Sequence, residues 1–544
     1  MIRLFALLII CLLCQSCAYY FGNRRIIKTP KDTTIYFEGR KPDTAKTIAE
    51  WQKHPIIAEW ANKQIDEDWN KRGKTDIPRI LLAKLALNQE IDSFVNYLLE
   101  IEPWGKSGTD WLLHPNGDYD FSEIIIINLL YLFGDDSIPI NQKTQEHILN
   151  VLLTEHKAKP FPKTPNTMGL MRETENHILM KESVRYLRRV WIAKHFNKAD
   201  KKLKKEIAYL EKWMLNHLKE LNTYGLWEYN SIPYLAYAFV PLLTLESHAA
   251  SDAIRTEARQ ILDKLNYFYA LGSLNFKRTV PFRRQMRRFG HSDLSSDPHT
   301  SLMMSWYYVQ KGEGVSNENS PHRTHQSLMA LLLNYRLPDG IMHILENKDS
   351  SEKFFHVGHG WQSSPELHWK SNNALISGGG VQRGKISQLV PRPIVLILND
   401  TAKNISDCFH VKGGDKVSEL NNTGIYKSLA VGKGEVYVPK WAEMITKKEG
   451  WSLYKTPFAK DFIMVYSNKD FGLFYYITNT EKPVSVFEAI VANNKQPFNA
   501  FHYPNGDLIQ YDIHAPKNKW VMKTLNKKAL DRKFDRWNGL KIYN

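Results

Sequence analysis

A polar pair at the start of an apolar helical pattern is the part of this 544-residue chain best suited to chemistry. Asn176 and His177 stand four and three residues before Met180, which opens an apolar stripe that continues at spacings of four and three. The pair therefore projects from the inward face of a helix at its beginning. An amide and an imidazole there can donate hydrogen bonds and exchange a proton. A capped helix with a hydrogen-bonded core histidine accounts for the same residues.

An aromatic segment follows this pair. Residues 224–238 carry five aromatic side chains and lead from a loop into a helix, and Tyr234 and Tyr237 share one helical face. A tyrosine hydroxyl can serve as an acid or a base. Packing of the rings in the core, with the hydroxyl at its rim, is the alternative explanation.

The two stretches together resemble the α/α-toroid polysaccharide lyases, the group that includes alginate lyases and heparinase II/III-like enzymes. In those families an Asn or Asn-His pair lies on an inner helix, and a tyrosine follows some fifty to sixty residues later in a segment rich in glycine and aromatics. Here Tyr237 follows His177 by 60 residues. Many members also carry a β-sandwich after the toroid. The resemblance covers two short motifs and the order of the domains.

The resemblance implies β-elimination in a uronic-acid polymer. Asn176 would donate a hydrogen bond to the substrate carboxylate, as an oxyanion hole does. His177 would assist that neutralisation or take the C5 proton itself. Tyr237 would be the acid for the glycosidic oxygen, and in some substrates also the base, with Tyr234 as its rival. The sequence does not choose between the two tyrosines.

Further residues are expected to contact substrate rather than react with it. Because the ordinary pKa of tyrosine is about 10, a tyrosine base needs a nearby cation, and Arg172 is one candidate. His356 and His359, three residues apart, suit a metal, but spacing fixes no third ligand, so we expect neither a metal nor a cofactor. The expected contact residues are Arg172, Glu175, Trp227, Tyr229, His359 and Trp361.

Two other functions remain open. Asp118 and Asp120 precede an apolar helix, and capping of that helix is the favoured explanation for them. Asp120 and Glu175 could instead form the acid/base pair of a glycoside hydrolase on the same scaffold. A non-catalytic glycan-binding lipoprotein is the third possibility, because a fold alone does not determine function.

Periodicity divides the chain into a helical part and a strand-rich part. Apolar spacings of three and four predict helices between about 45 and 337, within residues 80–99, 124–133, 148–153, 177–193, 207–221, 235–245, 261–271 and 328–333. After residues 377–380 short apolar runs predict strands at 394–398, 424–429, 435–438, 462–466, 472–478, 484–491 and 508–511, with a hairpin turn at 467–470.

The expected fold class is therefore a multidomain α+β protein. Residues 18–375 would form an α/α toroid of about ten or more helices, because helix pairs in such number stack or close into a ring. Residues 376–544 would form an antiparallel, β-sandwich-like domain.

The first seventeen residues have the pattern of a signal peptide. Arg3 precedes an apolar run at 4–13 that is too short to span a bilayer, and Ser16-Cys17 resembles a lipobox. Cys14 stands where a lipobox has leucine. We therefore expect export, with the protein periplasmic or anchored to the outer membrane through a lipid on Cys17. Cys408 is the one cysteine beyond the leader, so no internal disulfide is expected.

Charge indicates the kind of partner. The formal net charge of +16 raises the local concentration of polyanions. Export and the absence of a nucleic-acid-binding motif argue against nucleic acid, and membrane contact is expected only through the lipid anchor. The expected partner is an acidic polysaccharide such as alginate or a glucuronan, with a glycosaminoglycan as the next choice. The sequence does not indicate an oligomeric state.

Overall fold

A computed structural model gives the fold of most of the chain. It describes residues 54–65, 69, 76–103, 118–135, 140–153, 175–196, 200–226, 228–232, 234–282, 294–295, 297–311, 325–346, 351–359, 365–379, 394–399, 401–411, 423–516, 519–530 and 538–543. Cys17, Arg172, Trp227 and Trp361 lie outside the described residues, so their expected roles stay predictions. None of the described helices has both the length and the apolarity needed to cross a membrane.

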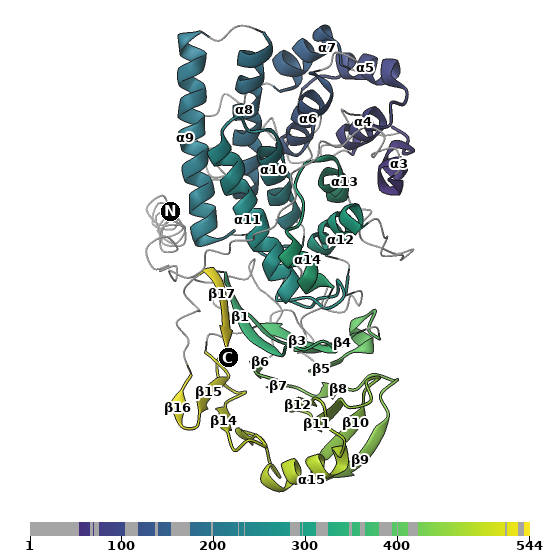
Figure 1. The fold of residues 1–544 in the computed structure, drawn as a ribbon, viewed down its shortest axis with the longest axis vertical. Coiled ribbons are helices and arrows are strands. Elements are labelled where there is room, and N and C mark those ends of the chain that lie inside the picture. The colour runs from purple at the N-terminus through teal and green to yellow at the C-terminus, as the bar shows by residue number, and fades with distance from the viewer. Residues whose placement is uncertain are drawn as a thin grey trace, which may run out of the picture.

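The N-terminal part consists of helices packed side by side (Figure 1). In chain order they are α3 (Pro55–Ala61), α4 (Ile77–Ala86), α5 (Ile91–Glu100), α6 (Asp120–Phe133), α7 (Gln142–His147), the π-helical turn η1 (Ile148–Leu152), α8 (Glu175–His195), α9 (Lys201–Tyr224), α10 (Leu235–His248), α11 (Asp252–Leu271), α12 (Pro298–Lys311), α13 (His325–Leu332) and α14 (Asp339–Leu345).

Most predicted helices are present, with one division. The run predicted at 80–99 is two helices, α4 and α5, because Asn88 and Glu90 between them have positive φ angles that an α-helix cannot contain. The short helices α3, α7 and α14 were not predicted individually, since six or seven residues show too little periodicity to detect. The 14-residue helix α12 was also missed.

Helices α6, α8 and α10 run in the same direction and pack on one another. Helices α9 and α11 return along their outer side, and α9 and α11 also contact each other (Figure 1). As a result, the first turns of α6, α8 and α10 meet at the end of the helical part that faces the strands. α13 contacts α3 and α4, which brings the last helices beside the first.

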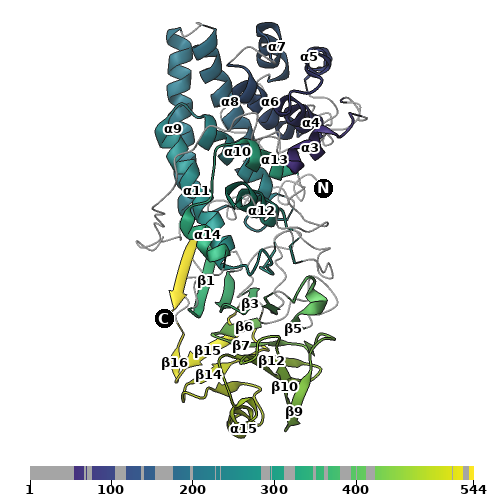
Figure 2. The ribbon, with the colours of Figure 1, turned by 45° about the vertical axis from the view of Figure 1, so that its right-hand side comes forward.

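The C-terminal part consists of antiparallel sheets stacked below the helices (Figures 1 and 2). The seven-stranded sheet has the order β17 (Asn538–Tyr543), β1 (Lys353–His359), β2 (Glu366–Lys370), β3 (Ala374–Gly379), β4 (Val395–Leu398), β5 (Phe409–Val411) and β8 (Val436–Tyr437). The six-stranded sheet has the order β6 (Thr423–Tyr426), β7 (Leu429–Lys433), β12 (Phe471–Ile477), β11 (Phe462–Ser467), β10 (Trp451–Lys455) and β9 (Met444–Lys448). The four-stranded sheet has the order β13 (Ala500–His502), β14 (Leu508–Tyr511), β15 (Met522–Leu525) and β16 (Lys528–Ala529).

The seven-stranded sheet is buried on both faces, and β1 shows how. Phe354 packs into a core shared with the six-stranded sheet, which includes Ile463 and Phe474. Phe355 and Val357 point the other way and pack on Phe268 and Leu271 of α11. Successive side chains of a strand point to opposite faces, so this one strand contributes to both interfaces.

Three details of the strand prediction need correction. Residues 484–491 belong to a helix, α15 (Pro483–Asn493), whose Phe487, Ile490 and Val491 recur at helical spacing and pack with the six-stranded sheet. Residues 424–429 are a hairpin, because Lys427 has a positive φ between β6 and β7. Strand structure starts at Lys353, ahead of the change of pattern that placed the boundary at 376.

A buried ion pair fixes the connection from α11 to α12. The Arg278 guanidinium donates to both oxygens of Asp297 at 2.9 Å, and both side chains are at most 3% exposed. Asp297 also accepts from the backbone N–H groups of His299 and Thr300, so it caps α12. Burial alone would raise the pKa of Asp297, but the neighbouring guanidinium holds that pKa well below its usual range.

We predict that Arg278→Met lowers the free energy of unfolding by about 3–5 kcal/mol, because it leaves a buried carboxylate without its cation. Lys194→Met is the matched control, since Lys194 pairs with Asp135 on the surface, where such a pair contributes less than about 1 kcal/mol. Denaturant unfolding measures both values. Equal losses for the two variants would contradict the structural role of the buried pair.

Candidate functional site

Four side chains from the first turns of adjacent helices form a cluster at the end of the helical part that faces the sheets. His177 of α8 shares a hydrogen bond of 2.6 Å between its Nδ1 atom and Oδ2 of Asp120, the first residue of α6. The ring of Phe121 packs edge-on against both His177, at 5.4 Å between ring centroids, and Tyr237 of α10, at 4.4 Å. Phe121 therefore contacts both the imidazole and the phenol.

Asn176 belongs to the same end of α8. Its side chain is buried, at 1% exposure, one residue before His177. The predicted inward orientation of Asn176 is therefore confirmed, and the expected burial of His177 is largely confirmed, since its side chain is 14% exposed. The pair is placed by the apolar stripe of α8, in which Met180, Val184 and Leu187 are buried in the helical core.

Tyr237 stands at an unusual position in α10. It is the third residue of that helix, and Pro241 follows it by four residues. Proline has no backbone N–H, so the regular helical bond to the Tyr237 carbonyl cannot form. Tyr234 precedes the helix as its N-terminal flanking residue, with a non-helical backbone. The ring of Tyr237 contacts Phe121 and so joins the cluster.

Arg79 adds a cation that sequence reasoning missed. It is the third residue of α4 and is 5% exposed, with its Nε atom buried and without a hydrogen-bond partner. Burial lowers the pKa of the Arg79 guanidinium, and Tyr237 and Asp76 are the neighbours that oppose this shift. Arg79 is thus a buried positive charge that interacts electrostatically with Tyr237.

Asp120 does not cap α6, contrary to the favoured explanation from sequence. Tyr119 is the residue that flanks the helix, and it makes no side-chain capping bond. The Asp120 carboxylate is fully buried and is directed at His177 instead. A carboxylate in the first turn of a helix also interacts favourably with the helix dipole.

A second polar group lies on the sheet, opposite the helix ends. Oε1 of Glu366, on β2, accepts a hydrogen bond from the Asn230 side chain and lies 2.7 Å from Nε2 of His359, with which it is hydrogen-bonded. Oε2 of Glu366 is hydrogen-bonded to Nε2 of His368 at 2.9 Å. The His359 ring stacks on Tyr229 at 4.0 Å between centroids. All three sheet residues stand on the face of the sheet that packs on the helices, because the antiparallel register pairs Glu366 with Val357 and His368 with Phe355.

One loop joins the two groups. Residues 228–230 connect α9 to α10, and the Glu228 backbone N–H donates to the Glu175 carboxylate of α8 at 2.6 Å. Two residues later, Asn230 donates to Glu366. Asn230 has a φ of 47°, a left-handed conformation that asparagine tolerates better than most residues. Glu175, Tyr229 and His359, three of the expected contact residues, therefore belong to one connected structure.

The suggestion that His356 and His359 share a metal does not fit the structure. Residues three apart in a strand lie on opposite faces. The Nδ1 atom of His356 is 2.7 Å from the Tyr543 hydroxyl, whereas His359 lies on the other face beside Glu366. Burial holds the pKa of His356 well below its usual value.

A different trio could hold a metal. Asp118, Asp120 and His177 each offer one ligand atom, and these atoms lie within 4.8 Å of one another. Two carboxylates and an imidazole suit several divalent ions. The direct contact between Asp120 and His177 also accounts for the arrangement without an ion.

Sequence reasoning found part of this site. It found Asn176, His177 and Tyr237 by spacing, but it did not assign roles to Arg79, Phe121, Glu366 or His368. Nothing in the sequence singles out Arg79 among 73 basic residues, because only the packing of α4 brings it to Tyr237. No protein-family model matches the chain, and no curated protein sequence matches it either. The geometry of the site is therefore the basis for a function.

We predict that Glu366→Gln lowers the free energy of unfolding by about 3 kcal/mol at pH 7, because the buried donors lose their charged acceptor. Burial would raise the pKa of Glu366, but hydrogen bonds from His359 and His368 and their charges hold it well below its usual range. Arg278 and His299 also interact electrostatically with the Glu366 carboxylate.

A lowered carboxyl pKa contributes stability above the unfolded-state value of about 4.3, and that contribution is lost as the pH falls below it. The difference in the free energy of unfolding between wild type and Glu366→Gln should therefore become smaller as the pH falls from 6 to about 3. Glu488→Gln, at an exposed glutamate 3.8 Å from Lys448, should show almost no gap at any pH. A gap for Glu366→Gln that widens in acid would contradict this assignment.

Proposed function

We propose that this protein is an exported polysaccharide lyase that cleaves an acidic, uronic-acid-containing polysaccharide by β-elimination. The observation that carries the proposal is the cluster of Asp120, His177 and Tyr237, in which Phe121 contacts both the imidazole and the phenol. The buried Arg79 interacts electrostatically with Tyr237 of this cluster. An acid/base pair beside a buried cation is what removal of a proton next to a carboxylate requires.

The electrostatics of the cluster favour a carboxylate ligand. The first turns of α6, α8 and α10 direct their backbone N–H groups and the positive ends of their dipoles toward the same region. Arg79 adds a full positive charge in a buried setting, where charges interact more strongly than in water. Together these groups offset the charge that develops on the substrate carboxylate when its neighbouring carbon is deprotonated.

Each side chain then has a role in the proposed reaction. Asn176 donates a hydrogen bond to the substrate carboxylate, and His177 takes the C5 proton. The electron pair of that bond forms the C4–C5 double bond while the glycosidic C4–O bond breaks, and Tyr237 protonates the leaving oxygen. Asp120 stabilises the imidazolium that forms on His177, because its carboxylate is bonded to Nδ1.

The finer fold assignment belongs to the same proposal. In the α/α-toroid lyases, inner helices present the reactive residues at one end of a ring. Here α6, α8 and α10 carry the cluster, and α13 contacts α3 and α4 as a closing ring would. We infer that the helical part is such a toroid, with the seven-stranded sheet covering the reactive end and Cys17 as the lipid anchor outside the cytoplasm.

A glycoside hydrolase is the second candidate. Oxygen atoms of Asp118 and Asp120 lie within 4.8 Å of each other, and two nearby carboxyl groups are the basic requirement of glycoside hydrolysis. Asp120, however, is bonded to His177, and the Glu175 carboxylate accepts the Glu228 N–H. These carboxylates hold other groups in place, which favours elimination over hydrolysis.

The proposal is tested with a panel of alginate, glucuronan and glycosaminoglycans. Elimination leaves an unsaturated uronate that absorbs in the near ultraviolet, whereas hydrolysis gives reducing ends without that absorbance and a binding protein gives neither. We predict that Tyr237→Phe reduces the rate of absorbance increase by about 100-fold or more. Tyr234→Phe is the matched control and should retain turnover, because the proposal assigns the acid to Tyr237, whose ring contacts Phe121, and Tyr234 precedes α10. If both variants keep full turnover, the assignment of the acid is wrong.

Arg79 gives a second test. We predict that Arg79→Met lowers kcat/KM by tenfold or more, a loss of about 1.4 kcal/mol of transition-state stabilisation, and that Arg79→Lys recovers part of it. Lys84→Met removes another cation from α4 and should leave kcat/KM unchanged, because Lys84 pairs with Glu90 away from Tyr237. Steady-state kinetics on the same glycan measures all three. Unchanged kinetics for Arg79→Met would remove Arg79 from the site.

A further inference from the structure

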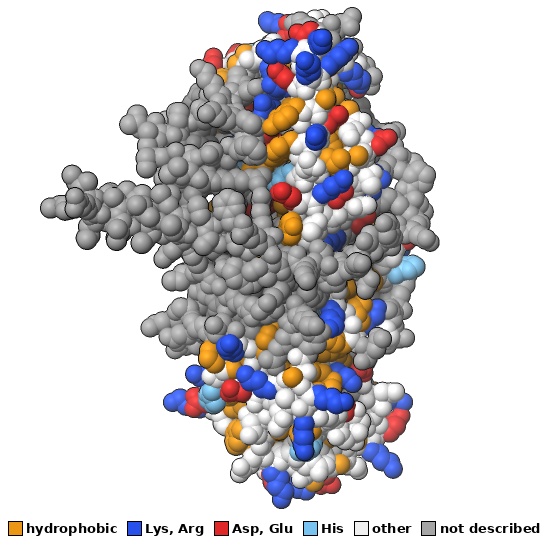
Figure 3. Space-filling view, turned by 90° about the vertical axis from the view of Figure 1, so that its left-hand side faces the viewer, with side chains coloured by type: hydrophobic (Ala, Val, Ile, Leu, Met, Phe, Trp, Pro, Cys, Tyr) orange, Lys and Arg blue, Asp and Glu red, His pale blue; other side chains and the backbone are white. Residues whose placement is uncertain are grey.

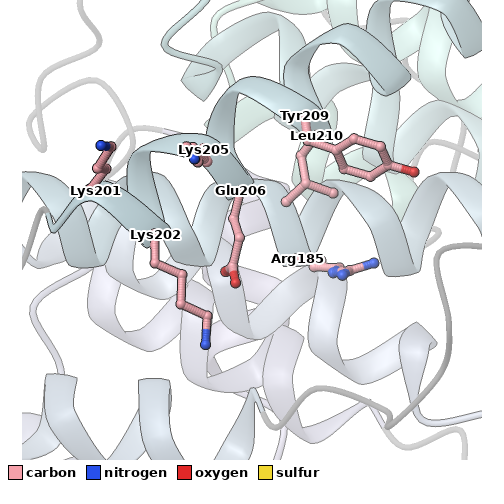
Figure 4. A pocket seen from close by; sticks show the side chains of 7 residues that line it. All are labelled: Arg185, Lys201, Lys202, Lys205, Glu206, Tyr209 and Leu210. Carbon is pink, nitrogen blue, oxygen red and sulfur yellow. The ribbon is translucent and has the colours of Figure 1, made fainter.

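A basic hollow lies on the outer side of the helical part, between α8 and α9. Its volume is about 480 Å³, and we refer to it as the α8–α9 hollow. The space-filling view of this side shows Lys and Arg side chains gathered at the upper end of the molecule (Figure 3). The lining residues are Arg185, Lys201, Lys202, Lys205, Glu206, Tyr209 and Leu210 (Figure 4).

The positive charge of the hollow is only partly neutralised. Lys201, Lys202 and Lys205 are exposed and form no ion pair with any described residue. The one carboxylate of the lining, Glu206, accepts from Arg189 at 2.9 Å. An additional cation, Arg185, is 3.5 Å from Glu182, and its Nε atom is buried without a hydrogen-bond partner.

An exposed aromatic ring accompanies these cations. Tyr209 is 50% exposed, although large apolar and aromatic side chains of the described residues are mostly buried. In Figure 4 its ring lies on the same side of α9 as Arg185, and Leu210 lies next to it. An aromatic face next to ammonium groups suits a sugar ring that carries a negative charge, since the ring packs on tyrosine while the charge meets lysine.

The hollow is separate from the candidate site. Arg185 follows Asn176 by nine residues on α8, which is about 14 Å along the helix axis and half a turn around it. The cluster therefore occupies the inner side of α8 near its start, and the hollow occupies the outer side near its middle. A short oligosaccharide bound at one place does not extend to the other, whereas a long polymer does.

We propose that the α8–α9 hollow is a second binding site for the acidic polysaccharide, which holds the polymer while the cluster acts on another part of it. This inference rests on the proposed function for its substrate class. Attachment at a second site raises the effective concentration of the polymer at the first without a new contact there. A concave surface with an aromatic ring favours a glycan over a flat anionic membrane.

The test reverses the charge of the hollow. Lys201→Glu, Lys202→Glu and Lys205→Glu are combined in one variant, with Lys433→Glu, Lys440→Glu and Lys469→Glu as a control of equal net charge at exposed lysines of the strand-rich part. The hollow variant should fold, because acids at 201 and 202 lie in the first turn of α9, where they suit the helix dipole, and Lys205 is exposed. Thermal unfolding of both variants checks this.

Binding is measured in the Tyr237→Phe background, so that the polymer is not degraded, with long-chain sodium alginate and heparin as probes. The hollow variant should bind at least one probe about fivefold or more weakly than the control, with a salt dependence reduced by about three charges. In the background with Tyr237 intact, KM for the long polymer should rise while KM for a short oligosaccharide stays unchanged.

Equal losses in both variants, no loss in either, or no binding of either glycan by the parent protein would overturn the inference. Phosphatidylglycerol vesicles form the other arm of the experiment. If the vesicles alone lose binding in the hollow variant, the hollow is a membrane contact and the inference is wrong.

The same experiments separate this inference from the proposed function. Glycan binding that depends on the hollow, without an elimination product, would contradict the proposed function and leave the second site in place. An elimination product without glycan binding that depends on the hollow would support the proposed function and contradict the second site.

Discussion

The arrangement of the site depends on one buried carboxylate between the helices and the sheet. Glu366 has to be surrounded by donors, because an ionised group with no partner is very costly to bury. Its donors come from the sheet, through His359 and His368, and from the loop before α10, through Asn230. The same loop donates to Glu175 on α8. The requirement to satisfy one acid thus sets the position of the sheet relative to the first turns of the helices.

Periodicity predicted the parts of the site that lie on a helix with a clear apolar stripe. The stripe of α8 fixes the direction of Asn176 and His177, so a pattern of threes and fours was enough to place them. Arg79 and Asp120 could not be placed in this way, because their roles arise from contacts between helices that are distant in sequence. Short apolar runs predicted an antiparallel, strand-rich C-terminal part but not the order of strands in its three sheets, because strand pairing depends on residues distant in sequence. The helix α15 was mistaken for a strand because eight apolar-rich residues fit either period.

Arg79 and the lysines of the α8–α9 hollow have different proposed roles. Arg79 is buried, and in the proposed reaction its charge assists the reacting groups in a setting where charges interact strongly. The lysines of the α8–α9 hollow are exposed and screened by salt, so they attract a polymer but contribute little to chemistry. A net charge of +16 alone does not distinguish these roles. The distinction comes from burial and from the helix face on which each residue lies.

The central claim is that the cluster at the helix ends removes a proton and does not add water. Mass spectrometry of the oligosaccharides released from a uronate polymer tests it most directly. The account predicts products whose new non-reducing end is lighter by one water molecule than the hydrolytic product, and it predicts their loss in Asn176→Ala. Released oligosaccharides that all contain the added water, whether or not Asn176 is present, would contradict it.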